Sequence, residues 1–169
     1  MNRKTASLLS SARRPSTRTV KALIVSVSTN GFRTSLGRAG IADAARAALR
    51  AERVTNALLS ITLLDKRGIA KMNREHIGHA GPTDVISFGF ARATPADPVI
   101  GDIYIAPDVA RDNAKAGGVS THDELTRLVV HGVLHVLGYD HPESDARTQS
   151  EMWKRQERIV GRLTIRRSR

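Results

Sequence analysis

The sequence predicts a single α+β domain in which a mixed sheet of four or five strands is packed by helices. Three observations lead to this fold class. A length of 169 residues suits one hydrophobic core, short β-branched runs are interleaved with stretches of helical periodicity, and the chain shows no internal repeat. A central predicted helix ends in a motif with three histidines.

Strands and helices alternate in the first half of the chain. Residues 22–28 are short, apolar and β-branched, which is typical of a strand, whereas residues 34–50 place apolar side chains at helical spacing. In order, the elements predicted here are a strand over 22–28, a helix over 34–50, a strand over 58–64 that ends at Asp65–Gly68, a short helix over 69–75 and a loop over 78–83.

The second half predicts two further strands and three helices. Pro107 lies in the first turn of one helix and two glycines follow its end, as helix boundaries prefer. The elements are strands over 85–88 and 100–105 and helices over 107–116, from about 121, and over about 143–160. One face of the last helix predicts core contacts for Ala146, Met152, Trp153, Ile159 and Val160.

The central helix has a clear start and a buried stripe. Thr121 and Glu124 match a capping box, which predicts a start near residue 121. Gly132 falls inside the stripe, where a missing side chain favours the close approach of another backbone. The apolar stripe consists of Leu125, Leu128, Val129, Gly132 and Val136.

The three histidines of the motif have the spacing of metal ligands. His131 and His135 are four residues apart, so they project from the same face of a helix. Gly138 permits a left-handed C-cap that turns the chain back and brings His141 to the same point. Three imidazoles leave the fourth tetrahedral position open, which is the layout of a catalytic zinc site. We expect one Zn²⁺, although histidines alone also suit other transition metals.

The motif lacks the general base of the zinc proteases. Those enzymes have Glu after the first histidine, and this chain has Gly132, which argues against peptidase activity. Three neutral imidazoles leave the charge of a divalent ion uncancelled, which favours ionisation of a coordinated water. Asp140 is a candidate for moving the proton; its alternative role is to hold a histidine tautomer. The other three histidines, His76, His79 and His122, have no ligand spacing.

The net charge of +11 is concentrated at the two ends of the chain. Residues 1–21 carry six basic and no acidic side chains, and residues 154–169 carry seven basic side chains and one acidic one. We therefore expect a basic N-terminal tail over 1–20, a domain over 21–160 and a basic C-terminal tail over 161–169. Basic tails favour attraction to polyphosphate; the alternatives are a role in solubility or a disordered extension.

Composition excludes several classes of protein. The absence of cysteine excludes disulfides and cysteine-ligated zinc and fits a reducing cytoplasm. No apolar run reaches the roughly 20 residues that span a bilayer, so we expect no membrane association. Aromatic residues make up 4% of the chain, too few for an extended base-stacking platform.

The motif and several other segments resemble the YbeY-type rRNA maturation factors, which are bacterial metal-dependent endoribonucleases. The resemblance runs from about residue 54 to 153. It is carried by Asn73, Pro82–Phe88 (PTDVISF), Gly101–Ala106 (GDIYIA), Glu124–His131 and His131–His141 (HGVLHVLGYDH).

The resemblance implies an endoribonuclease that prefers single strands. It implies work in small-subunit rRNA 3′ end processing and ribosome quality control in the cytoplasm. It also implies rRNA, the ribosome, ribosomal proteins and a ribosome-assembly GTPase as partners.

One position departs from the family. The family usually has an arginine facing the substrate where this chain has Ile77, and Arg74 or His79 is a candidate replacement. Thr83 and Ser87 offer hydroxyls to a phosphate, whereas each also suits an ordinary turn or strand position. Two other functions stay open: a metallohydrolase acting on a non-nucleic substrate, and a non-catalytic ribosome-assembly factor whose metal braces the fold.

Overall fold

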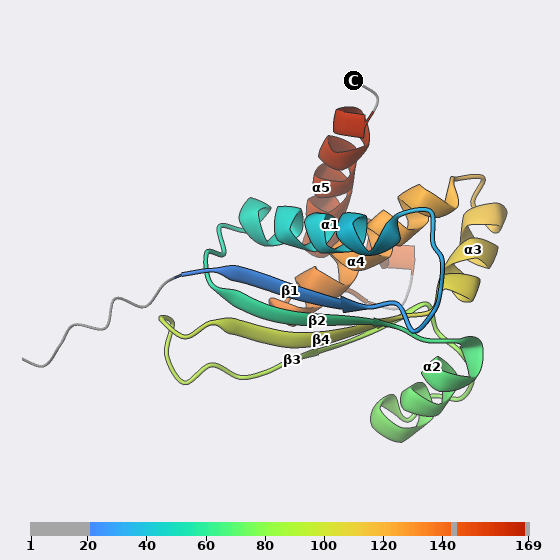
Figure 1. The fold of residues 1–169 in the computed structure, drawn as a ribbon, viewed down its shortest axis with the longest axis horizontal. Helices are drawn as coiled ribbons and strands as arrows, with labels where there is room; N and C mark the ends of the chain where they lie inside the picture. Colours follow the sequence, from blue (N-terminus) through green and yellow to red (C-terminus); the bar gives the residue numbers. More distant parts are fainter. Residues whose placement is uncertain (1–20, 143–144, 168–169) are drawn as a thin grey trace, which may run out of the picture.

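A computed structural model describes residues 21–142 and 145–167 and confirms an α+β domain with a mixed sheet (Figure 1). The sheet has four strands in the order β1-β2-β4-β3. Strands β1, β2 and β4 run parallel to one another, and β3 runs antiparallel to β4. The strands are β1 (Leu23–Ser28), β2 (Ala57–Leu63), β3 (Val85–Gly89) and β4 (Val99–Ile105).

Most of the helices lie on one face of the sheet, and the main hydrophobic core fills the space between (Figure 1). On this face α1 packs against β1, and α4 packs against β3 and β4. The helices are α1 (Gly37–Ala51), α2 (Lys66–Met72), α3 (Pro107–Ala116), α4 (Thr121–Val136) and α5 (Glu151–Arg167), with a π-helix, η1 (Asn73–Ile77), after α2 and a 3-10 helix, η2 (Asp145–Gln149), before α5.

Helix α4 is buried on more than the one stripe predicted from its sequence. The sheet covers one side, and α1, α3 and α5 pack on the others. Val130, Val133 and Leu134 are therefore as buried as the predicted stripe residues Leu125 and Val129. This central position lets α4 carry functional side chains at the edge of a rigid core.

The opposite face of the sheet is covered at one end only. There Ile69 of α2 packs with Ile86 and Ala106 in a second, smaller cluster. Farther along, Ile24, Leu58 and Ile100 lie side by side in the strand register and stay 41 to 55% exposed.

Helix α4 starts at Thr121 as predicted but with a different capping residue, whereas α2 starts earlier than predicted. Ser120 caps α4 by accepting a hydrogen bond from the Asp123 N–H, so Thr121 is already inside the helix and no capping box forms with Glu124. Asp65 caps α2 by accepting a hydrogen bond from the Gly68 N–H. The segment Asp65–Gly68, predicted to end a strand, therefore begins a helix.

The last helix lies farther along the chain than the predicted range of 143–160. Ser150 accepts a hydrogen bond from the Trp153 N–H, and this cap starts α5 after a 3-10 turn. Met152, Ile159 and Val160 are buried as predicted, but Ala146 belongs to η2 and is exposed. The helix continues to Arg167, and Leu163 packs against the core beyond the predicted end.

The predicted basic tail over residues 1–20 lies outside the described residues. Within the described part of the chain, no helix combines the length and the apolar character needed to cross a bilayer.

Candidate metal centre

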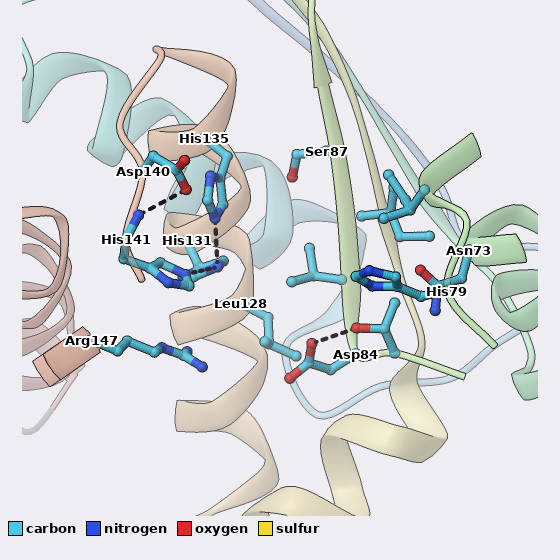
Figure 2. Close-up of a pocket in the computed structure, with 14 residues that line it drawn as sticks. Asn73, His79, Asp84, Ser87, Leu128, His131, His135, Asp140, His141 and Arg147 are labelled. Atoms are coloured by element: carbon cyan, nitrogen blue, oxygen red, sulfur yellow. Dashed lines mark hydrogen bonds between the residues drawn. The ribbon is translucent and has the colours of Figure 1, made fainter. Parts of the chain in front are cut away.

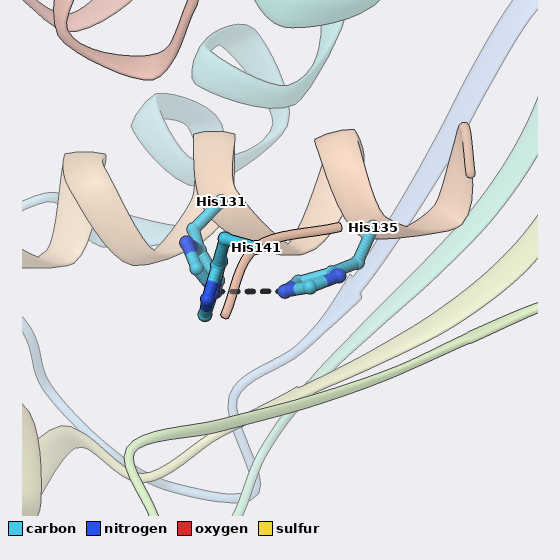
Figure 3. Close-up of side chains that lie close together, drawn as sticks. All are labelled: His131, His135 and His141. Atoms are coloured by element: carbon cyan, nitrogen blue, oxygen red, sulfur yellow. Dashed lines mark hydrogen bonds between the residues drawn. The ribbon is translucent and has the colours of Figure 1, made fainter. Parts of the chain in front are cut away.

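His131, His135 and His141 point their ring nitrogens at one place beside α4 (Figure 3). The Nε2 atom of His131 lies 3.0 Å from Nε2 of His135 and 3.4 Å from Nε2 of His141. One nitrogen from each ring lies within 4.8 Å of the other two. Among the described residues, this is the one group of three potential metal ligands.

A Schellman turn after α4 brings His141 back to the two helical histidines. The N–H of Tyr139 donates to the Leu134 carbonyl, and the N–H of Gly138 donates to the His135 carbonyl. Gly138 has a φ of +90°, which costs a non-glycine residue about 1–2 kcal/mol. This confirms the predicted left-handed cap at Gly138.

The tautomer of His131 is set by a chain of hydrogen bonds from α5. The carboxylate of Glu157 accepts a hydrogen bond from Gln156 Nε2 at 3.0 Å, which turns the Gln156 amide oxygen toward His131. That oxygen lies 2.8 Å from His131 Nδ1, so Nδ1 carries the proton. The Nε2 lone pair of His131 therefore faces the other two histidines.

Arg127 stabilises the chain of hydrogen bonds that runs from Glu157 through Gln156 to His131. Its guanidinium contacts both carboxylate oxygens of Glu157, at 3.0 and 3.3 Å, and also Glu124 at 3.1 Å. Burial raises the pKa of Glu157, but hydrogen bonds from Arg127 and Gln156 outweigh it and lower that pKa. Glu157 thus stays an acceptor and keeps the Gln156 amide in one orientation.

His141 is oriented by the backbone. Its Nδ1 lies 3.0 Å from the Pro142 carbonyl oxygen, which can only accept, so this ring too turns its Nε2 lone pair inward. Asp140 accepts a hydrogen bond from the backbone N–H of His141 at 2.8 Å. In the described residues, the contacts that set the tautomers come from Gln156 and Pro142, and Asp140 holds the turn.

The donor set fits a divalent transition metal. Tetrahedral Zn–N bonds of about 2.0–2.1 Å place neighbouring ligand nitrogens about 3.3 Å apart. The Nε2 separations of 3.0 and 3.4 Å agree with that spacing. The three histidines leave further coordination positions toward the pocket, and they would hold the metal with its open side facing a substrate.

Burial favours the neutral, ligating form of His131 and His135. The pKa of His131 is lowered from 6.5 to about 4, and burial is the main cause. The hydrogen bond to Gln156 acts in the opposite direction, and neighbouring His135 and Arg147 contribute to the lowering. Burial also lowers the pKa of His135, assisted by His141. Because a metal binds only the neutral ring, these pKa shifts allow metal binding at lower pH.

The metal-free protein is expected to lose stability as the pH falls from 6.5 to 4. In this window the unfolded chain protonates His131 while the folded state does not, so the free energy of unfolding falls with falling pH. The His131 contribution amounts to about 3 kcal/mol over the whole window. Urea denaturation of metal-free protein across this range measures it. A His131→Gln variant should show a flatter pH profile, and an equally steep profile would contradict the assignment.

Replacing Gln156 by leucine is expected to weaken metal binding about 10- to 100-fold, because His131 loses the acceptor that sets its tautomer. Leucine keeps the side-chain volume, so the 1%-exposed site stays filled. Competition with a chromogenic chelator measures the affinity. The exposed Gln149 provides the control, Gln149→Leu, which should leave the affinity unchanged. Equal affinities for the two variants would contradict the role of Gln156.

The three histidines form one wall of a pocket of about 490 Å³ (Figure 2). The opposite wall comes from η1, the loop after it and β3, which contribute Asn73, His79 and Ser87. Asn73 is buried and donates a hydrogen bond to the Gly81 carbonyl, which ties this loop to the helix. The remaining lining residues are Ile77, Thr83, Asp84, Val85, Ile86, Leu128, Asp140 and Arg147.

The structure brings most of the predicted site residues into this pocket. Thr83, Ser87 and Asp140 line it together with the histidines. Asp84 also lines it and accepts a hydrogen bond from Asn113 of α3, which supports a structural role. Arg74 is exposed on η1 and is absent from the lining, whereas His79 is present.

Sequence reasoning missed Arg147 and Gln156. Arg147 reaches from η2 toward the pocket (Figure 2), and its guanidinium carbon lies 5.6 Å from the Trp153 ring centroid. Its Nε is buried without a hydrogen-bond partner among the described residues. In the sequence, Arg147 and Gln156 are visible only as a cation and an amide shortly after the motif. They belong to elements whose packing the sequence does not specify.

The close packing around Gly132 explains why no glutamate follows His131. A Cβ built on it would lie 2.7 Å from Cγ2 of Ile103 and 3.0 Å from Oγ of Ser87. The close approach predicted at this glycine exists, but side chains of β3 and β4 make it rather than another backbone. The position is structural and has no room for a general base.

An α+β domain whose central helix ends in an open three-histidine site defines a single-domain, metal-dependent hydrolase. Comparison with known proteins gives the family. The family model "Endoribonuclease YbeY" matches residues 28–164, and the chain belongs to this family.

Curated relatives with the same description support the assignment. The chain is 42% identical to the one from Acidothermus cellulolyticus over 123 residues, which is 62% of this chain and 75% of the relative. It is 38% identical to the one from Frankia alni over 112 residues, 60% of this chain and 61% of that relative. The relative from Bacillus licheniformis is 41% identical over 119 residues, 65% of this chain and 74% of its own length.

A known structure shares the fold. The solution structure of a Thermotoga maritima protein superposes with a TM-score of 0.60 at 23% identity, covering 86% of this chain and 93% of that one. At this identity the likeness concerns the fold alone.

Proposed function

We propose that this protein is a single-strand-preferring endoribonuclease that processes the 3′ end of small-subunit rRNA and takes part in ribosome quality control. One observation supports it above all: one pocket combines three inward-facing imidazole nitrogens with a cation, Arg147, whose Nε has no hydrogen-bond partner among residues 21–142 and 145–167. This set matches what a phosphodiester needs, a metal for one oxygen and a fixed positive charge for another.

The residues of the chain would divide the work. A bound divalent metal, Zn²⁺ in our proposal, supplies a Lewis acid and lowers the pKa of a coordinated water. Gln156 and the Pro142 carbonyl hold the rings of His131 and His141 with Nε2 facing inward. Asp140 is our candidate for the residue that carries a proton, since it precedes His141 in the chain and lines the pocket. No carboxylate follows His131, so this differs from peptidase chemistry.

Substrate binding falls to the pocket walls. Arg147 would hold a phosphate by charge-assisted hydrogen bonds, with hydroxyls of Thr83 and Ser87 on the facing wall. The Ser87 Oγ is buried and has no hydrogen-bond partner within the described part of the chain, so this wall of the pocket carries one unsatisfied hydroxyl. Arg74 lies outside the pocket, and its part would be limited to RNA beyond the cleavage point.

Replacing Arg147 by glutamine is expected to raise KM for RNA about 10- to 100-fold while metal content stays unchanged, because a charged hydrogen bond to phosphate is lost. Steady-state cleavage of a single-stranded RNA measures KM and kcat, and metal analysis accompanies it. Arg74→Gln removes the same charge outside the pocket and should raise KM much less. If the two variants behave alike, Arg147 is not the phosphate-binding residue.

The proposal includes the setting that the family suggests. The substrate would be rRNA in the cytoplasm, with the ribosome, ribosomal proteins and a ribosome-assembly GTPase as partners. The two basic ends of the chain suit a polyanionic partner through salt-sensitive attraction.

The deciding experiment compares cleavage of three substrates by the metal-loaded and metal-stripped protein. They are a precursor small-subunit rRNA with its 3′ extension, the same extension annealed to a complementary strand, and casein. We expect metal-dependent cutting of the single-stranded extension alone. Cutting of casein would instead support a metallohydrolase of another class. A protein that binds metal and cuts none of the three would support an assembly factor with a bracing metal.

A further inference from the structure

A second hollow, of about 470 Å³, lies between the end of α1 and the length of α5, away from the metal pocket. Four arginines line it: Arg53 follows α1, and Arg155, Arg158 and Arg162 project from successive turns of α5. We call these four residues the α5 arginine cluster. The hollow has one acidic lining residue, Glu52.

Glu52 and Glu151 both pair with Arg155 of the cluster, and in the described part of the chain neither pairs with the other three arginines. The Oε2 atom of Glu52 accepts hydrogen bonds from Arg155 Nη1 at 2.9 Å and from the Tyr139 hydroxyl at 2.7 Å. The Glu52 side chain is only 11% exposed. The Arg155 guanidinium also lies 4.9 Å from the Tyr139 ring centroid. These contacts build a rigid floor from one arginine, one glutamate and one tyrosine.

The other three arginines carry free charge. Within residues 21–142 and 145–167, no ion pair forms at Arg53, Arg158 or Arg162, and all three are exposed. Arg50 lines an adjoining hollow together with Arg162 and adds to the same positive surface. The hollow is thus concave, strongly cationic and already partly rigid before any ligand arrives.

The cluster is joined to the metal centre through two short connections. Tyr139, which contacts both Glu52 and Arg155, lies two residues before the metal-site residue His141. On α5, Arg155 immediately precedes Gln156, whose amide oxygen contacts His131. Arg158 and Arg162 then continue about 5 and 10 Å along the helix. The arginine hollow and the metal site are thus built on neighbouring segments of the chain.

We propose that the α5 arginine cluster is a second RNA-binding site, which holds the backbone phosphates flanking the cleaved bond. This inference rests on the proposed function. Arginine suits phosphate because its planar guanidinium donates two parallel hydrogen bonds and stays charged at all working pH values. A bilayer is a poorer match, since Ile165 is the one exposed large apolar side chain near the hollow among the described residues.

The test measures RNA binding rather than cleavage. Metal-free protein is titrated against two fluorescent single-stranded RNAs, one of about 16 nucleotides and one of about 4, over a range of salt concentrations. The test variant carries Arg53→Gln, Arg158→Gln and Arg162→Gln and keeps Arg155, which pairs with Glu52. The control carries Arg38→Gln, Arg67→Gln and Lys115→Gln, three exposed cations on other helices. Thermal unfolding verifies that both variants fold.

We expect the test variant to bind the longer RNA about tenfold more weakly at 0.1 M salt. The slope of the logarithm of the association constant against the logarithm of the salt concentration should become less steep by about 2. Binding of the short RNA should not change. The control should keep both values. Equal losses in the two variants would overturn the proposal, because charge alone would then explain binding. It would also be overturned if the test variant lost binding to vesicles of phosphatidylserine and phosphatidylcholine but kept RNA.

The two proposals fail separately. If the metal-loaded wild type does not cut RNA and the test variant still loses RNA affinity, the cluster stands as a binding site and the nuclease function falls. If the wild type cuts RNA and the test variant binds the longer RNA as the wild type does, the nuclease function stands and the cluster proposal is wrong.

Discussion

Replacing His135 by alanine is expected to abolish both metal binding and RNA cleavage. The site then keeps two imidazoles, His131 and His141, and two ligands do not hold a divalent ion in the presence of water and competing chelators. Loss of an outer hydrogen-bond partner costs up to about 100-fold, so loss of a direct ligand should exceed that. Metal analysis of the purified protein and single-turnover cleavage of precursor rRNA measure the two effects on the same samples.

The control for this prediction is a histidine of the same pocket that takes no part in the cluster. His79 lines the pocket but lies outside the three-histidine group, so His79→Ala should retain metal. The metal-free His135→Ala protein should keep the fold, because the core does not include this side chain. Cleavage that persists in His135→Ala at wild-type rate would show a contaminating nuclease and would favour the assembly-factor alternative.

Replacing Gly132 by alanine is expected to destabilise the protein by about 1–3 kcal/mol. The new Cβ would lie 2.7 Å from Ile103 Cγ2, a branched side chain that is 1% exposed and cannot move aside freely. Gly132→Glu, which would rebuild the protease motif, should be worse, because it also buries a carboxylate at this contact. Urea denaturation measures the loss of stability, and neither variant should hydrolyse casein.

Gly161 offers a matched control for the change at Gly132. It also lies inside a helix, but a Cβ built on it meets nothing within 4 Å. Gly161→Ala should therefore stabilise the protein by up to about 1 kcal/mol through helix propensity alone. If Gly132→Ala were as stable as Gly161→Ala, the contact with Ile103 would not be the reason for glycine after His131.

The sequence predicted the convergence of the three histidines well because their geometry is local. His131 and His135 share a helix face by periodicity, and Gly138 sets a turn through its own backbone preference. The strands were equally readable, since short β-branched runs have few alternatives. Helix starts were less reliable. Two neighbouring residues, Ser120 and Thr121, are both good caps, and only the backbone path selects Ser120.

The parts of the site contributed by distant segments were beyond the sequence. Gln156 contacts His131 from 25 residues away, and its amide orientation depends on Glu157 and Arg127. Arg147 enters the pocket because η2 precedes α5, whereas the sequence predicted one continuous helix there. Arg74 lies on η1 but is exposed and does not line the pocket.

By itself, the sequence determined the fold class through the alternation of strand and helix patterns along the chain. It also determined the convergence of three histidines and the absence of a glutamate after His131, because both follow from one short stretch of backbone. The tertiary structure decided which nitrogen of His131 faces inward, which cation enters the pocket and why Gly132 must lack a side chain. It also brought Arg53 beside α5 to form the second hollow. These properties depend on which segments pack together, and packing is set by the whole core at once.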